Sequence, residues 1–133
     1  MSQAASNPTP LSPAQAQALA ERYVAVWNEK NPAARRRQIA ELWAPKGEHF
    51  VKTREVRGYE ALEARVTGSH ETNVVSKNQH FRVVANAQAL QDTITFNWEM
   101  VANGTGEVTA VGLEFLHLDG AGRILVDYQF MVA

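Results

Sequence analysis

The chain has 133 residues, of which 45% are hydrophobic and 20% are charged, and its formal net charge is −1. This size and composition predict one globular domain with a single core and exclude wholesale disorder. The balanced charge gives no electrostatic footprint for nucleic acid or an anionic membrane, so neither partner is predicted. The chain has no cysteine, which excludes disulfides, thiolate nucleophiles and cysteine-ligated metals.

The first residues differ in composition from the rest. Residues 1–11 are rich in Ser, Ala, Asn and Pro and lack the basic and apolar regions of a secretory signal. We therefore expect a disordered leader over 1–11 and a single domain over 12–133. No later apolar run has the length of a membrane-spanning helix, and the cysteine-free composition fits a reducing compartment. A cytoplasmic protein is the expectation.

A first helix is predicted from residue 13. Ser12 supplies an N-cap hydroxyl, Pro13 suits the first helical position, and Gln15 can complete a capping box. Apolar residues then recur at helical spacing and form one stripe, which comprises Leu19, Tyr23, Val26 and Trp27. Such a stripe has to pack on a core.

Two further helices are predicted before the strands begin. Asn31-Pro32 repeats the cap-then-proline signature, and Pro45 and Gly47 are expected to end that second helix. A short strand over 48–53 follows, and a third helical pattern runs from Gly58 to about Gly68.

The second half of the chain predicts strands. The segments are rich in β-branched and aromatic residues and cover 81–84, 92–102, 107–118 and 123–132. Glycine-rich turns at 103–106 and 119–122 separate the last three, so these strands are expected to pair antiparallel. Helices followed by a meander indicate an α+β domain with the helices on one face of the sheet.

Strand periodicity sorts the side chains by face. Ile94, Phe96, Trp98 and Met100 share one face, which we expect to lie toward the helices. Strands 107–118 and 123–132 carry apolar residues on the opposite face as well, which indicates a covered surface. We predict a homodimer through that outer face, formed by Val111, Leu113, Phe115, Tyr128 and Phe130.

Motifs for metals and cofactors are absent from the sequence. The four histidines, His49, His70, His80 and His117, are too scattered to predict a metal site. Neither glycine-rich turn leads from a strand into a helix, so no phosphate cradle is predicted and no cofactor is expected.

Glu114 is the most informative polar residue. Its carboxyl lies between Gly112 and Leu116 on an apolar strand face, so it must meet a partner or stay protonated. A basic partner such as Arg65, or a wet strand end, is the structural alternative to a functional role. Tyr23 is open to the same two interpretations, as a core tyrosine or a site residue.

Several segments together resemble a known superfamily. They are the helix 20–28 around Tyr23, Leu42-Trp43-Ala44, Arg57-Gly58, and Glu114 eight residues before Gly122. In order and spacing they resemble the SnoaL-like and ketosteroid isomerase-like branches of the NTF2-like superfamily, from Leu19 to Met131. The resemblance implies a cone of three N-terminal helices on a strongly curved, mostly antiparallel sheet that encloses a pocket.

The resemblance also implies site residues. In ketosteroid isomerases, residues at the places of Tyr23 and a protonated Glu114 form an oxyanion hole. Val51 stands where those enzymes carry the aspartate base, so His49 or Asp127 is the candidate base here. The expected pocket wall for a small apolar or aromatic ligand is formed by Trp27, Trp43, Val51, Phe96, Trp98, Met100, Leu116, Gln129 and Met131.

Two functions fit these residues. One is an isomerase or cyclase that uses general acid–base chemistry on an apolar carbonyl or polyketide-like ligand. The other is a non-catalytic module for ligand binding or dimeric assembly, because one fold hosts many functions.

Overall fold

The computed structural model describes residues 10–133, so the predicted leader lies almost entirely outside the described residues. The helices are α1 (Pro13–Asn28), α2 (Pro32–Leu42) and α3 (Gly58–Ser69), and α3 runs into a π-helical segment, η2 (His70–Ser76). The strands are β1 (Trp43–Val51), β2 (Arg54–Arg57), β3 (Gln79–Val83), β4 (Gln88–Leu90), β5 (Thr93–Ala102), β6 (Val108–Leu118) and β7 (Ile124–Met131). The predicted α+β class is confirmed.

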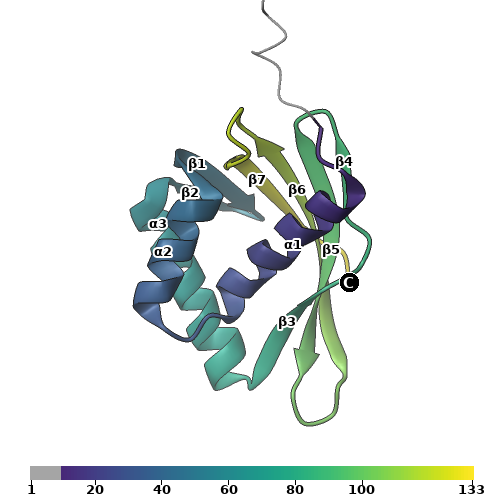
Figure 1. The fold of residues 1–133 in the computed structure, drawn as a ribbon. Helices are drawn as coiled ribbons and strands as arrows, with labels where there is room; N and C mark the ends of the chain where they lie inside the picture. The colour runs from purple at the N-terminus through teal and green to yellow at the C-terminus, as the bar shows by residue number, and fades with distance from the viewer. Residues whose placement is uncertain (1–9) are drawn as a thin grey trace, which may run out of the picture.

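The seven strands form one sheet in the order β2-β1-β7-β6-β5-β3, with β4 also paired to β5. All pairs are antiparallel except β1 with β7, which run parallel. The sheet curves without closing, and the helices gather on its inner side (Figure 1). α1 packs against β3, β4 and β5, whereas α2 and α3 contact β1.

The end of the second helix differs from the prediction. β1 already begins at Trp43, so Pro45 and Gly47 lie within a strand and do not terminate a helix. The register of β1 against β7 shifts between Trp43 and Glu48, and a Cβ on Gly47 would lie 2.9 Å from the Ala44 carbonyl oxygen. Proline and glycine are therefore accommodated by a bulge, a position that tolerates both.

Some short elements were not predicted. β2 and β4 have four and three residues, too few for an alternating pattern to stand out. The third helix also continues beyond Gly68 into η2. Arg35 of α2 is buried, and its guanidinium donates to the Glu29 carbonyl oxygen at 2.6 Å and to the Thr67 hydroxyl at 3.1 Å.

The core lies between the helices and the inner face of the sheet, as predicted. The whole α1 stripe is buried, namely Leu19, Tyr23, Val26 and Trp27. Ile94, Phe96 and Trp98 of β5 are buried against it, and Met100 is half-buried at its margin. One contiguous apolar cluster thus joins the three helices to the sheet.

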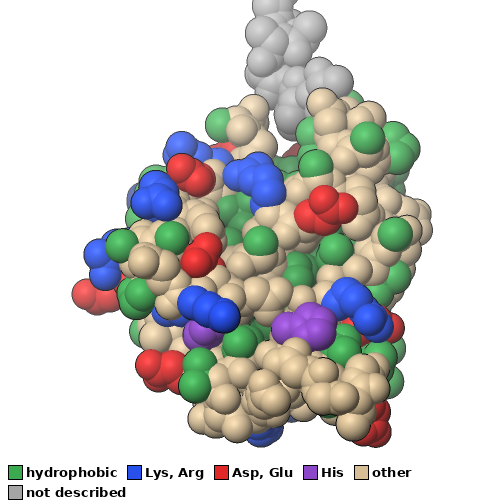
Figure 2. Space-filling view, turned by 60° about the horizontal axis from the view of Figure 1, so that its bottom comes forward, with side chains coloured by type: hydrophobic (Ala, Val, Ile, Leu, Met, Phe, Trp, Pro, Cys, Tyr) green, Lys and Arg blue, Asp and Glu red, His purple; other side chains and the backbone are tan. Residues whose placement is uncertain are grey.

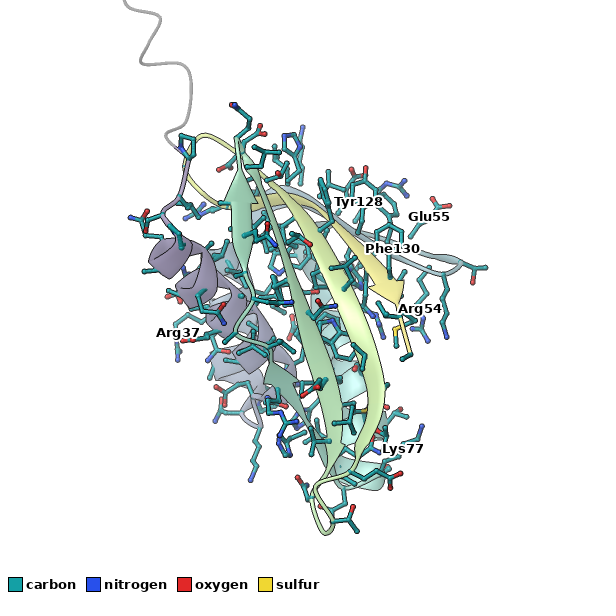
Figure 3. All side chains as sticks on the ribbon, turned by 90° about the vertical axis from the view of Figure 1, so that its right-hand side faces the viewer. Arg37, Arg54, Glu55, Lys77, Tyr128 and Phe130 are labelled. Atoms are coloured by element: carbon teal, nitrogen blue, oxygen red, sulfur yellow. The ribbon has the colours of Figure 1, made fainter. Side chains whose placement is uncertain are left out.

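The outer face of the sheet carries exposed aromatic residues. Phe115, Tyr128 and Phe130 are 41%, 43% and 54% exposed, and Val111 and Leu113 are half-buried. Figure 3 shows Tyr128 and Phe130 on the side of the sheet away from α1. This apolar face is available to a partner, and the homodimer stays a prediction.

The charged surface is mixed in sign. On the face seen in Figure 2, lysine and arginine side chains are interspersed with aspartate and glutamate around hydrophobic recesses. Within residues 10–133, none of the helices combines the length and hydropathy needed to cross a membrane.

Gly112 is tested by substitution with alanine. A Cβ there would lie 2.1 Å from two ring carbons of Trp98, so we expect Gly112→Ala to lower the free energy of unfolding by about 3 kcal/mol. The control is Gly68→Ala, where a Cβ meets open space within α3 and should raise it by up to about 1 kcal/mol. Urea denaturation measures both; equal stability of the two variants would contradict the packing.

Candidate functional site

Tyr23 projects from the buried face of α1 toward the sheet. The capping box predicted at Ser12 and Gln15 is present and fixes the start of this helix. The ring of Tyr23 packs edge-on against Phe96, with centroids 5.5 Å apart. Its hydroxyl oxygen lies 2.5 Å from Asp127 Oδ2 and 3.1 Å from Glu114 Oε2. A single hydroxyl thus joins α1 to β6 and β7.

The strand register brings the polar residues together. Asp127 of β7 pairs with His49 of β1 and with Leu116 of β6, so Glu114 lies two residues along on the same face. Residues opposite one another on paired strands share a face. His49, Glu114 and Asp127 are all fully buried. The structure thus brings these three residues together with Tyr23 in one connected group.

Hydrogen bonds connect the buried polar residues on both sides of Asp127. Arg65 Nε lies 3.4 Å from His49 Nε2. His49 Nδ1–H donates to Asp127 Oδ2 at 2.8 Å. On the other side, Trp98 Nε1–H donates to Glu114 Oε1 at 2.8 Å. Arg65 therefore contacts His49, whereas Glu114 has Trp98 and Tyr23 as its partners.

The two carboxyl groups are held in opposite protonation states. Burial, together with the negative charge of Asp127, raises the pKa of Glu114 well above its usual range, so Glu114 is neutral. Burial also opposes ionisation of Asp127, but the neighbouring His49 and the hydrogen bonds to it outweigh burial and lower its pKa. Such divergence within a carboxyl pair separates a proton donor from a proton acceptor.

The tyrosine stays protonated between them. Burial, and then the negative charge of Asp127, raise the pKa of Tyr23 well above its usual value. Its one proton goes to Asp127, the nearer and ionised partner, and protonated Glu114 can donate to the Tyr23 oxygen. Asp127 Oδ1 is buried without a hydrogen-bond partner among the described residues. That oxygen is able to take up a proton without breaking an existing bond.

A pocket of about 180 Å³ opens in front of this network. Of the residues predicted for its wall, six line it: Trp27, Val51, Trp98, Met100, Gln129 and Met131. Trp43, Phe96 and Leu116 lie in the core and not at the lining, because strand alternation reveals the face of a residue but not its distance from a cavity. Of the four candidate catalytic residues, Tyr23 alone lines the pocket.

Sequence reasoning missed half of the lining. The additional residues are Val24, Lys52, Arg54, Arg65, Ser69, Asn73 and Phe81. The sequence contained only a weak indication of these residues. Lys52 and Arg54 closely follow Val51 at the end of its strand, and Arg65 lies one helical turn after Leu62. Arg65 also lies over Trp27, with its guanidinium carbon 5.1 Å from the ring centroid.

The buried polar group also has metal-ligand types. Among residues 10–133, His49, Glu114 and Asp127 form the one group of three whose ligand atoms all lie within 4.8 Å of one another. A divalent ion there would have to displace the proton of Glu114 and compete with the Trp98 and Tyr23 donors. The arrangement fits a cluster that shares protons better than it fits a metal centre.

Solved structures of other proteins share this architecture. A candidate isomerase of the SnoaL-like family from Agrobacterium tumefaciens is 20% identical, with a TM-score of 0.82, and the match covers 90% of this chain and 99% of that one. An NTF2-like protein of unknown function from Exiguobacterium is 16% identical, with a TM-score of 0.67, over 86% and 98% of the two chains. The fold is NTF2-like.

A third protein of similar structure is a candidate ketosteroid isomerase from Kribbella flavida, which is 16% identical with a TM-score of 0.66, over 90% of this chain and 79% of that one. No family sequence model and no curated protein sequence matches the chain. At these identities the likeness establishes the NTF2-like fold, and the activity has to be argued from the residues of the site.

The buried state of Glu114 predicts a pH effect on stability. The folded protein keeps a proton that the unfolded chain releases above the ordinary pKa of 4.5, so the wild type loses stability as pH rises past that value. Glu114→Gln keeps the acceptor for Trp98 and a donor for Tyr23 but cannot titrate. We expect its melting temperature, relative to wild type, to rise from about pH 5 to about pH 8.

The control for this measurement is Glu107→Gln, which removes an exposed carboxyl from the turn before β6. Its melting temperature should keep a constant offset from wild type over the same pH range. A constant offset for Glu114→Gln as well would show that Glu114 is ionised in the folded protein.

Proposed function

We propose that the protein binds a small carbonyl compound with an apolar body in this pocket and moves a proton on it, as isomerases and cyclases do. The observation that carries the proposal is the position of Tyr23, which lines the pocket while its hydroxyl lies 2.5 Å from the ionised Asp127. Short, buried contacts between groups of opposed protonation state are typical of acid–base sites.

The chemistry follows from the order of the hydrogen bonds. A proton leaving the carbon next to the ligand carbonyl passes to the Tyr23 oxygen as the Tyr23 proton passes to Asp127. The same relay in reverse returns the proton to a different ligand atom, and the sum is an isomerisation with no other reactant. His49 holds the Asp127 carboxylate in place by its Nδ1–H.

Glu114 assists this proton transfer by a hydrogen bond to Tyr23. As a neutral acid it can donate to the Tyr23 oxygen, which stabilises negative charge developing there during transfer. This role differs from the oxyanion hole that the resemblance implies, since Glu114 is fully buried and does not line the pocket. In the proposed mechanism Tyr23 is the single point of contact between ligand and network.

One observation favours the alternative of a non-catalytic ligand-binding module. The buried polar side chains form a continuous hydrogen-bonded chain within the protein, which runs from Trp98 through Glu114, Tyr23 and Asp127 to His49. Apart from Asp127 Oδ1, this network is satisfied without a ligand, and such a network stabilises a fold whether or not it moves protons.

Substitution of Tyr23 separates these two functions. In D₂O, we expect the wild type to accelerate exchange of the α-protons of cyclohexanone or phenylacetone, and Tyr23→Phe to slow the catalysed exchange by at least about a hundredfold. Proton NMR follows the loss of signal. The matched control is Tyr59→Phe, because the Tyr59 hydroxyl donates to the Trp43 carbonyl oxygen at 2.8 Å and lies outside the network.

Three results bear on the proposal. Exchange that survives in Tyr59→Phe and is lost in Tyr23→Phe supports proton transfer through Tyr23. Binding of the ketones by the wild type without exchange supports the non-catalytic module. Exchange that is equal in both variants removes Tyr23 from the mechanism.

We also propose that two copies associate through the outer sheet face. Tyr128 stacks on Phe50 with centroids 5.7 Å apart and meets Phe115 edge-on, so the exposed aromatic rings form a continuous surface. Phe130 extends this surface and is 54% exposed. Contiguous apolar surface of this kind is typical of self-association sites.

The oligomeric state tests the second proposal. Light scattering coupled to size-exclusion chromatography should give twice the chain mass for wild type and the single chain mass for the double variant Tyr128→Glu/Phe130→Glu, because the charges would be buried unpaired. The control, Val75→Glu, changes an exposed apolar residue on η2 and should stay dimeric. A monomeric wild type would rule out the dimer.

A further inference from the structure

Three cations line the pocket, and they come from separate parts of the chain. Lys52 and Arg54 flank the turn between β1 and β2, and Arg65 comes from the middle of α3. The same lining contains no aspartate or glutamate. Ordinary protein surface mixes both signs, as the face in Figure 2 does, so a pocket with cations only is a distinctive feature.

The three cations lack carboxylate partners. Within residues 10–133, Lys52, Arg54 and Arg65 take part in none of the salt bridges, although Arg36, Arg57 and Arg82 each pair with a glutamate. Among the described residues, the side-chain hydrogen bond of Arg65 is the long one to His49, at 3.4 Å. Its guanidinium therefore has further donors to offer.

The charges within the pocket also favour binding of an anion. Burial, and then repulsion by Arg54, lower the pKa of Arg65, while the negative charge of Asp127 acts in the opposite sense. Arg54 and Arg65 are thus close enough to repel, and Asp127 lies behind His49 and is not part of the pocket lining. An anion between the two guanidinium groups would relieve that repulsion.

We infer that the ligand of this pocket is a small cyclic or aromatic acid whose carboxylate binds among Lys52, Arg54 and Arg65. Arginine matches the planar carboxylate with two parallel hydrogen bonds, and lysine adds a point charge. This inference rests on the proposed function, because it specifies the substrate of the same site: the reacting carbonyl compound carries an acid group.

The apolar lining and the volume of the pocket determine the size and polarity of the rest of the ligand. The pocket that holds the cations and Tyr23 also has an apolar wall, formed by Trp27, Phe81, Trp98, Met100 and Met131. The volume of about 180 Å³ is near the cavity of about 150 Å³ that holds benzene, and below the roughly 300 Å³ at which pockets for drug-sized ligands begin. One ring with short substituents fits, and a fused four-ring ligand does not.

The orientation of the ligand follows from these positions. With its carboxylate at the cations, its ring lies against the apolar wall and its far end faces Tyr23. Arg65 itself packs on Trp27, which holds the guanidinium in place without neutralising it. The carboxylate is thus an anchor that sets which ligand atom meets the hydroxyl.

The test compares an acid with its neutral isostere. Isothermal titration calorimetry measures binding of phenylacetate and phenylacetamide to the wild type, to the double variant Lys52→Gln/Arg54→Gln, and to Arg37→Gln. Lys52 and Arg54 are exposed, so the double variant is expected to fold. The control, Arg37→Gln, removes a positive charge from α2, away from the pocket. Figure 3 shows Arg37 on the opposite side of the molecule from Arg54.

We expect the wild type and Arg37→Gln to bind phenylacetate at least about tenfold more tightly than the amide, the equivalent of one charge-assisted hydrogen bond. The double variant should lose most of that preference while its affinity for the amide stays unchanged. Added salt should weaken binding of the acid alone.

Failure of the inference differs from failure of the proposed function. Equal binding of acid and amide by the wild type overturns the anionic ligand and leaves the apolar carbonyl pocket intact. A preference for the acid that Arg37→Gln loses as much as the double variant also overturns it. Absence of binding by either compound, together with absence of catalysed ketone exchange, overturns both.

Discussion

Two carboxyl groups buried next to each other constrain the rest of this structure. Glu114 and Asp127 are both fully buried, and neighbouring carboxylates without solvent cannot both be ionised. The protein resolves the conflict by keeping Glu114 neutral and Asp127 charged, and by placing the Tyr23 hydroxyl between them. Because Tyr23 belongs to α1, the same hydroxyl also ties the first helix to the sheet inside an otherwise apolar core.

The protonation states of Glu114 and Asp127 also depend on parts of the chain that neither donate nor accept the protons. Gly112 faces Trp98 across β5 and β6, and its missing side chain lets the indole lie close to the strand and donate to Glu114. The parallel pairing of β1 with β7 sets His49 beside Asp127. Packing of backbone and ring thus controls which carboxyl group holds the proton.

The site has a part away from the pocket and a part that lines it. His49, Glu114 and Asp127 do not line the pocket, whereas Tyr23, the apolar wall and the cations of Lys52, Arg54 and Arg65 do. An acid–base network that is buried and reaches the pocket lining through Tyr23 exchanges protons with little competition from water. Among the described residues, Lys52 and Arg54 make no hydrogen bond to the network, whereas Arg65 also contacts His49 at 3.4 Å and so connects the cations to it.

The fold could be predicted from local patterns to a large extent. The capping box at Ser12, the apolar stripe that contains Tyr23, and the alternation along β5 and β6 each reflect contacts between residues near in sequence. The same patterns misled at Pro45 and Gly47, because proline and glycine are typical both of a helix end and of a bulge. Alternation also put Trp43, Phe96 and Leu116 in the pocket wall, although they lie in the core.

The sequence by itself determined the α+β class, the inner face of the sheet and the residue types able to share a proton. Tertiary structure alone decided that Tyr23 meets an aspartate 104 residues away, that His49 meets the same aspartate 78 residues away, and that Arg65 joins Lys52 and Arg54 at one pocket. The physical reason is that hydrogen bonds, charge repulsion and burial act through space. Their partners are therefore set by strand register and helix packing, which no local pattern contains.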